Sequence, residues 1–274
     1  MAGEIVSTAK IFIGAQGWNY EDWIGSFYPR GSRTKELLSL YASIFDTVEI
    51  DSTFYAIPSE NSVKGWRQRT PANFNFSLKL PSEITHKNRL RESQGILEQF
   101  IQRISLLEYK LSCVLIQLPP DFSPNERPAF NQFIELLPSQ VKFAVEFRDA
   151  NWLTEETISA LARKNVALTL ADSRWIHRTQ SFSFIDNYPA DFAYVRWLGP
   201  RELTDFSRIQ LDRSKELEQW AAAFAALQKR AGTIYGYFNN HYQGHSPASC
   251  NLFKEIIGLS ALNPESLIKQ PSLF

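Results

Sequence analysis

The chain has 274 residues, of which 44% are hydrophobic, 21% charged and 14% aromatic. A chain of this length can fold as one large domain that buries well over half of its unfolded surface without disulfides or metals. Lys plus Arg and Asp plus Glu balance at 29 each, so charge does not favour extended nucleic-acid binding, although a local basic patch is still compatible with it. No stretch has the length and apolarity of a membrane span, and the first ten residues lack an apolar leader. Cys113 and Cys250 form no CxxC pair, so we expect buried, reduced thiols in a cytoplasmic protein.

Short β-rich runs alternate with amphipathic helical segments along the chain. Strands are predicted at Ile11–Gly14, Thr47–Asp51, Phe74–Leu80, Cys113–Leu118, Lys142–Arg148, Val166–Ala171, Phe192–Leu198 and Thr233–Asn239. Helices are predicted at Thr34–Ile44, Glu60–Arg69, Glu92–Tyr109, Glu126–Leu137, Glu155–Arg163, Ser214–Ala231 and Pro247–Leu259. This alternation is typical of βαβ units, and eight parallel strands close a barrel. We therefore predict a single (β/α)8 TIM-type barrel over residues 1–260 and a loosely attached C-terminal tail over 261–274.

Two features test this prediction of a barrel. Ser173–Pro189 shows no clear helix and is expected to be either a short irregular helix or a long loop. An open, doubly wound sheet is the competing architecture, and it usually carries a glycine-rich phosphate loop after its first strand. Here the first strand is followed by Gly14-Ala15-Gln16-Gly17-Trp18 and further bulky aromatics. That segment does not match the phosphate loop, so the barrel is favoured.

Polar side chains gather at the C-terminal ends of the predicted strands, where the loops of a barrel surround one mouth. They are Gln16, Glu49, Asp51, Lys79, Gln117, Glu146, Arg148, Asp172, Arg196, Asn239 and Asn240. Because residues two apart share a strand face, and buried charges need partners, we expect Glu49 to pair with Lys79 and Glu146 with Arg148. A structural ring of ion pairs that closes the barrel is the alternative to an active site.

The same segments carry a resemblance to a known family. The blocks are Gly17-Trp18-Asn19-Tyr20, Phe27-Tyr28-Pro29, Val48–Tyr55, Phe76–Lys79, Ile84-Thr85-His86, Gln117–Pro120, Val145–Arg148, Ala171-Asp172-Ser173, Ala193–Trp197 and Phe238–His241. Together they resemble the YecE-like family, domain of unknown function 72, over nearly the whole chain. Ala15-Gln16 replaces a Thr-Ser-like pair, and Cys250 replaces a small alanine. The resemblance implies a TIM-type barrel and no established activity.

The strand-end residues favour an enzyme that acts on a small anionic or polyhydroxylated metabolite by acid/base chemistry, without a cofactor. Glu146 is the predicted acid/base, assisted by Glu49 or Asp172, and Lys79 is either a charged partner or a Schiff-base amine. The predicted substrate-binding residues are Arg148, Arg196, Asn239, His241, His86, Tyr55, Trp18, Gln117 and Ser246. The sequence contains no GxSxG motif and no P-loop, so acyl-serine chemistry and nucleotide hydrolysis lack support.

Two other functions stay open. The first is a non-catalytic protein that binds a nucleotide or a nucleic-acid end through loop aromatics and arginines. The second is a metal-dependent enzyme, similar to sugar isomerases or endonucleases, with Glu49, Glu146, Asp172 and His241 as ligands. His241 and His245 are four apart, but Gly244, Ser246 and Pro247 place them on a loop. Because lysine and arginines compete for the same carboxylates, we predict no tightly bound metal.

We also predict an anion site for phosphate or carboxylate between Arg196 and the start of the last helix. Gly199 follows the seventh strand, and Gly244-His245-Ser246-Pro247 opens the helix. Barrels often bind phosphate there, because free N–H groups and the helix dipole favour negative charge. In the alternative, Arg196 pairs with Asp172 or Glu146, and Ser246 merely caps its helix.

Overall fold

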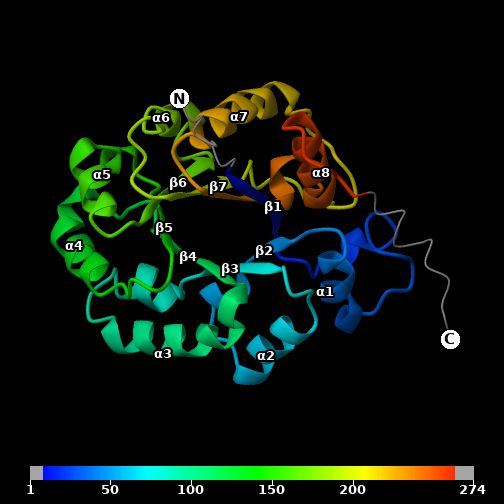
Figure 1. Cartoon of the computed structure of the whole chain (residues 1–274), viewed down its shortest axis with the longest axis horizontal. Helices are drawn as coiled ribbons and strands as arrows, with labels where there is room; N and C mark the ends of the chain where they lie inside the picture. The colour runs from blue at the N-terminus through cyan, green and yellow to red at the C-terminus, as the bar shows by residue number, and fades with distance from the viewer. Residues whose placement is uncertain (1–8, 263–274) are drawn as a thin grey trace, which may run out of the picture.

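The structure of the chain, a computed structural model, describes residues 9–262. Eight parallel strands are hydrogen-bonded in chain order, and β8 pairs with β1 to close a barrel (Figure 1). The strands are β1 (Lys10–Gln16), β2 (Thr47–Ile50), β3 (Asn75–Lys79), β4 (Leu111–Gln117), β5 (Phe143–Glu146), β6 (Ala167–Asp172), β7 (Phe192–Trp197) and β8 (Thr233–Phe238). The predicted TIM-type barrel is confirmed, and the open sheet is not formed.

Helices cover the outside of the barrel (Figure 1). They are α1 (Thr34–Ala42), α2 (Glu60–Gln68), α3 (Gln94–Ile104), α4 (Arg127–Glu135), α5 (Glu155–Ala162), α6 (Arg178–Phe182), α7 (Ser214–Leu227) and α8 (Ser246–Ile256). In α7 the buried Leu217, Trp220, Phe224 and Leu227 recur every three or four residues, so one stripe of the helix faces the strands. The segment after β6 forms the five-residue α6 and otherwise bends and turns, as its sequence predicts. Residues 263–274 of the predicted tail lie outside the described residues.

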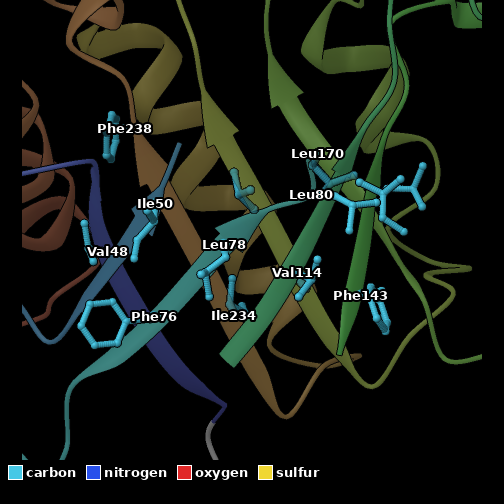
Figure 2. Close-up of a cluster of buried hydrophobic side chains, with 14 of the residues drawn as sticks. Val48, Ile50, Phe76, Leu78, Leu80, Val114, Phe143, Leu170, Ile234 and Phe238 are labelled. Atoms are coloured by element: carbon cyan, nitrogen blue, oxygen red, sulfur yellow. The ribbon is translucent and has the colours of Figure 1, made fainter. Parts of the chain in front are cut away.

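The core has two separate layers, because successive side chains of a strand point to opposite faces. The outer layer lies between strands and helices, and Figure 2 shows Val48, Ile50 and Leu78 in it. The inner layer fills the barrel itself and contains Cys113, Leu115, Ala144, Ala167, Phe192, Tyr194, Tyr235 and Tyr237. Each strand therefore sends alternate residues into the barrel interior, and the polar strand ends continue this inner face.

The start of α8 differs by one residue from the prediction. The N-cap is His245, whose Nδ1 accepts a hydrogen bond from the backbone N–H of Ala248 at 3.3 Å. Ser246 is already helical, and its hydroxyl donates to Asn240 Oδ1 at 2.7 Å. The Ser246 hydroxyl is therefore already hydrogen-bonded to the loop that precedes α8. Both cysteines are buried free thiols, as predicted.

Candidate active site at the barrel mouth

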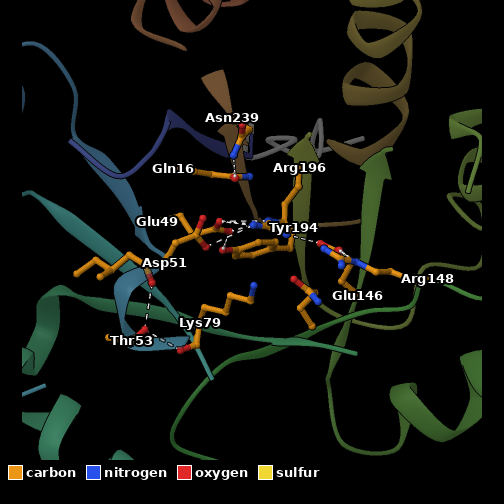
Figure 3. A network of polar contacts seen from close by, with 12 residues as sticks. Gln16, Glu49, Asp51, Thr53, Lys79, Glu146, Arg148, Tyr194, Arg196 and Asn239 are labelled. Atoms are coloured by element: carbon orange, nitrogen blue, oxygen red, sulfur yellow. Dashed lines mark hydrogen bonds and ion pairs between the residues drawn. The ribbon is translucent and has the colours of Figure 1, made fainter. Parts of the chain in front are cut away.

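Arg196, near the end of β7, is the centre of a buried ionic network (Figure 3). Its Nε lies 3.1 and 3.0 Å from the two carboxylate oxygens of Glu49, and its Nη2 donates to Glu49 Oε1 at 2.7 Å. Its Nη1 donates to Glu146 Oε2 at 2.5 Å. Glu49, Glu146 and Arg196 are 0%, 1% and 2% exposed, respectively. One guanidinium therefore joins β2, β5 and β7 across the barrel.

Each buried carboxylate has a second partner. The Tyr194 hydroxyl donates to Glu49 Oε2 at 2.6 Å, and Arg148 Nε donates to Glu146 Oε1 at 3.2 Å. The predicted Glu146–Arg148 pair is therefore present. The predicted pairing of Glu49 with Lys79 is wrong, because the forked donors of Arg196 reach Glu49 from the opposite side of the barrel. Of the alternatives for Arg196, the structure shows the pairing with Glu146.

The two buried carboxyls have different proton affinities. Burial raises the pKa of Glu49 to about 7, although Arg196 opposes the shift. Burial acts in the same direction on Glu146, but the positive charges of Arg196 and Arg148 outweigh it and lower the pKa of that carboxyl. Paired titratable groups whose environments separate their pKa values are typical of acid/base sites. The two carboxyls therefore differ in the direction of their pKa shift, which is upward for Glu49 and downward for Glu146.

A cavity of about 70 Å³ lies at the mouth of the barrel, over this network. We call it the mouth pocket, and its lining residues are Gln16, Asp51, Lys79, Gln117, Arg148, Arg174, Trp175, Arg196, Leu198, Gly199, Arg201, Asn239 and His241. Five of these side chains are cationic, whereas Asp51 is the carboxylate among them. Glu49 and Glu146 are not part of this lining. Such a wall favours a negatively charged ligand.

Aromatic rings hold two of the cations in place. The Lys79 ammonium lies 3.9 Å from the ring centre of Phe54, and the Arg148 guanidinium lies 3.8 Å from that of Trp175. Burial lowers the pKa of Lys79 to about 8, against the attraction of Asp51. Lys79 is therefore a group on the wall whose protonation can change near neutral pH.

Gln117 lines one side of the mouth pocket, and His86, which is not part of the lining, lies beside it. His86 belongs to a π-helical turn, Glu83–Lys87, and its Nε2 lies 3.5 Å from Nε2 of Gln117. Burial, followed by the charges of Lys79 and Arg148, lowers the pKa of His86 to about 4. Its imidazole is consequently neutral at physiological pH and available for hydrogen bonding.

The loops after β7 and β8 form the other side. Asn239 Nδ2 donates to Gln16 Oε1 at 2.8 Å, and Asn239 Oδ1 accepts from the backbone N–H of His241 at 2.9 Å. Gly199 has φ +65°, and a Cβ added there would lie 2.3 Å from the carbonyl oxygen of His241. The backbones of the two loops therefore touch at Gly199, which fixes the position of His241.

Four predicted site residues lie elsewhere. Asp172 is on the helix-facing side of β6, where Trp220 Nε1 and the Tyr242 hydroxyl donate to its Oδ2 at 3.0 and 3.2 Å. Ser246 is fully buried, Tyr55 is 82% exposed, and neither lines the mouth pocket. Since Arg196 is held by carboxylates and Ser246 is buried, the predicted anion site between them is not formed.

Trp18, the fourth predicted site residue that lies away from the mouth pocket, lines a neighbouring hollow of about 640 Å³, which we call the aromatic groove. Trp18, Tyr20 and Trp66 supply its rings, and it shares Gln16 and Asp51 with the mouth pocket. The two hollows therefore adjoin along the ends of β1 and β2. Trp66 lies on α2, where the helical pattern explains it as a packing residue.

Three residues of the mouth pocket were missed by sequence reasoning. Arg174 and Trp175 lie in the segment after β6, and Arg201 lies in the loop after β7. All three stand beyond the strand ends, in segments without a periodic pattern. The cationic character of the Arg174-Trp175 pair, directly after Asp172-Ser173, was the available signal.

Across residues 9–262, no group of three or more His, Cys, Asp or Glu side chains is placed to hold a metal ion. The metal ligands considered in the sequence analysis do not converge on one point. Asp172 faces α7, whereas Glu49 and Glu146 are bound by Arg196. No helix in this part of the chain is both long and apolar enough to cross a membrane.

The chain is similar in sequence to a known family and to two of its relatives. The family described as "Protein of unknown function DUF72" matches residues 12–272. The UPF0759 protein YecE of Escherichia coli K12 is 32% identical over 178 residues, which span 63% of each chain. The UPF0759 protein YunF of Bacillus subtilis is 26% identical over 94% of this chain and 99% of its own length.

Solved structures agree. A DUF72 family protein from Thermotoga maritima has a TM-score of 0.77 and 26% identity, covering 91% of this chain and 99% of its own. A DUF72 family protein from Enterococcus faecalis has the same fold, with a TM-score of 0.71 and 17% identity over 93% of this chain and all of its own. The resemblance noted in the strand-end blocks thus extends to the whole barrel, and the chain belongs to the DUF72 family.

Proposed function

We propose that the protein is an enzyme that binds a small metabolite by its carboxylate or phosphate group in the mouth pocket and acts on it by proton transfer. The observation that carries this proposal is the wall of five cationic side chains with one carboxylate, Asp51, at the C-terminal mouth of a barrel. Arg148 and Arg201 are suited to clamp the anion. Asn239 and Gln117 offer amides that orient polar groups of the substrate.

The proton-transfer residue of this proposal is Lys79, because it lines the pocket and its pKa is lowered to about 8 by burial. Glu146 and Glu49 are sealed below the pocket wall, so their proposed part is to position Arg148 and Arg196. This differs from the sequence prediction, which gave the acid/base part to Glu146. Asp172 has no part, since it faces the helices.

The aromatic groove supports a second candidate, a binding protein for a nucleotide or a nucleic-acid end. A ring stacked on Trp18 would leave an attached phosphate beside Gln16 and Asp51, at the border of the mouth pocket. In that case, Trp18→Ala would abolish the binding of nucleotides but spare that of small anions. The enzyme and the binding protein are thus distinguished by ligand size and by turnover.

Phosphate, sulfate and small carboxylates are expected to raise the melting temperature of the wild type. Arg148→Met should weaken their binding by about 10- to 100-fold, since a hydrogen bond to a charged group contributes about 1.5–3 kcal/mol. The matched control is Arg127→Met, because Arg127 also stacks on a tryptophan, 4.9 Å from the ring centre of Trp152, but lies outside the pocket. Equal shifts in all three proteins, or none in any, would contradict the anion site.

Turnover is tested with a pooled extract of small metabolites, followed by mass spectrometry. The wild type is expected to consume an anionic compound, and Lys79→Met to lose that turnover by at least about 100-fold, the size typical of a proton-transfer group. Arg127→Met should retain it. If the wild type binds anions but transforms none of the pool, the binding-protein alternative gains support.

A further inference from the structure

Lys79 is a buried lysine without a protein partner for its ammonium. Its side chain is 9% exposed and lines the mouth pocket. Across residues 9–262, Nζ makes no hydrogen bond and no ion pair with the protein, and its close contact is the face of Phe54 at 3.9 Å. An unpaired charge in such a place is costly. Figure 3 shows the Lys79 nitrogen pointing into the space between Glu49 and Glu146.

Lys110 shows how the same fold satisfies a buried lysine when the residue is structural. It is 3% exposed, and its Nζ donates to the carbonyls of Arg67 and Thr70 at 2.7 Å each and to Thr70 Oγ1 at 3.0 Å. All three ammonium protons of Lys110 are therefore engaged by acceptors of the protein itself, which leaves no position on this nitrogen for a ligand. Lys79, in contrast, has no protein acceptor around its Nζ among the described residues. Its nitrogen is free to contact a ligand, and a structural role does not explain why a buried lysine should lack acceptors.

The backbone of Lys79 is held firmly while its nitrogen is left free. The Thr53 hydroxyl donates to the Lys79 carbonyl at 2.7 Å, which ties the loop after β2 to the end of β3. Phe54, from the same loop, packs against the ammonium. The amine is therefore presented to the pocket at a fixed place, as covalent catalysis requires.

We infer that Lys79 is a nucleophilic amine that forms a Schiff base with the carbonyl carbon of an anionic aldehyde or ketone bound in the mouth pocket. This inference rests on the proposed function and narrows its substrate class. The neutral amine attacks the carbonyl carbon, a C–N bond forms, and the π electrons of C=O move to oxygen, which takes a proton. The carbinolamine then loses water to give C=N, so that amine plus carbonyl yields imine plus water.

The electrostatics of the pocket suit this chemistry. Four charged groups face Lys79: Asp51 and Glu146 favour its ammonium form, while Arg196 and Arg148 oppose it. Burial dominates and lowers the pKa to about 8, so a substantial fraction of the amine is neutral at physiological pH. Asp51, on the same wall, can accept and return protons through water during addition and dehydration.

The test uses glyoxylate, a small anionic aldehyde, with cyanoborohydride to reduce the imine to a stable secondary amine. Peptide mass spectrometry measures the rate of modification of each lysine. At pH 7, Lys79 is expected to react at least about tenfold faster than Lys215 and Lys229, which are exposed to solvent and lie outside the mouth pocket. Lys110 is expected to stay unmodified. The rate at Lys79 should rise with pH to a plateau with a midpoint near 8.

Two controls link the reaction to the pocket. Inorganic phosphate should suppress modification of Lys79 without affecting Lys215, and Lys79→Arg, which keeps the charge, should remove the fast reaction. Modification of Lys79 no faster than that of Lys215 and Lys229 would overturn the inference. If phosphate still stabilises the protein in that case, the anion site stands and the Schiff base falls. If phosphate neither stabilises nor protects, the proposed function fails as well.

Discussion

Replacement of Arg196 by methionine is expected to lower the free energy of unfolding by about 3–5 kcal/mol, the largest effect of any single change at the mouth. The guanidinium is the shared partner of Glu49 and Glu146, which are 0% and 1% exposed. Without it, two carboxylates remain in a buried site with one short-range partner each, Tyr194 and Arg148. Urea denaturation at pH 7 measures the loss.

The pH dependence of this loss of stability identifies its cause. In Arg196→Met, burial would hold the pKa of both carboxyls above their unfolded value of about 4.3. Groups with a raised pKa in the folded state stabilise the protein below the unfolded pKa and lose that contribution as pH rises. The defect should therefore shrink from pH 7 toward pH 4.5.

The control is Arg33→Met, which removes an exposed pair whose side chains are 68% and 38% exposed, and it should cost less than about 1 kcal/mol. A variant Arg196→Met as stable as Arg33→Met would show that the buried network does not depend on the guanidinium. A defect that is constant between pH 4.5 and 7 would show that the loss comes from packing instead.

Gly199→Ala is expected to destabilise the protein by about 2–5 kcal/mol and to weaken anion binding in the same variant. The residue has φ +65°, and the added Cβ would lie 2.3 Å from the His241 carbonyl oxygen and 2.6 Å from Tyr242 Cα. The left-handed conformation costs about 1–2 kcal/mol and overpacking about 1–3 kcal/mol. Because both contacts are backbone atoms, the loop after β8 has to move, and His241 moves with it. Urea denaturation and the phosphate melting shift measure the two effects.

Gly31→Ala separates these two causes. Gly31 has φ +82°, but a Cβ there meets nothing within 4 Å, so its alanine variant should lose about 1–2 kcal/mol and bind phosphate like the wild type. Equal losses of stability in the two variants would refute the close approach at Gly199. Wild-type phosphate binding by Gly199→Ala would show that the position of His241 does not matter for the anion.

Much of this architecture is predictable from the sequence, because local pattern determines both the strands and the face of each residue. The alternation at Glu49 and Asp51 or at Tyr194 and Arg196 places them inside the barrel, and the structure agrees. The partner of Glu49 was not predictable in this way. Which side chains meet across a barrel depends on strand tilt and register, which no local pattern encodes.

Other errors come from strand ends and loops. Asp172 shares a face with Leu170, which packs outside the barrel. A shift of one residue at the end of β6 is enough to turn the Asp172 side chain from the barrel interior to the helices. Arg174, Trp175 and Arg201 lie in segments without periodicity, where sequence gives no direction for a side chain. The covalent site proposed for Lys79 depends on a missing partner, and that is visible only when every neighbour is in place.

The contacts of Arg196 also have a consequence for the order in which the chain assembles. Glu49 precedes Arg196 by 147 positions and Glu146 precedes it by 50. During synthesis the two acidic strands leave the ribosome well before the basic one. Until β7 has been synthesised, burial of Glu49 or Glu146 inside a partial barrel is unfavourable, so both carboxylates stay hydrated. The barrel therefore closes only after its seventh strand is available. Nascent chains that end before β7 should expose unburied strands and bind chaperones.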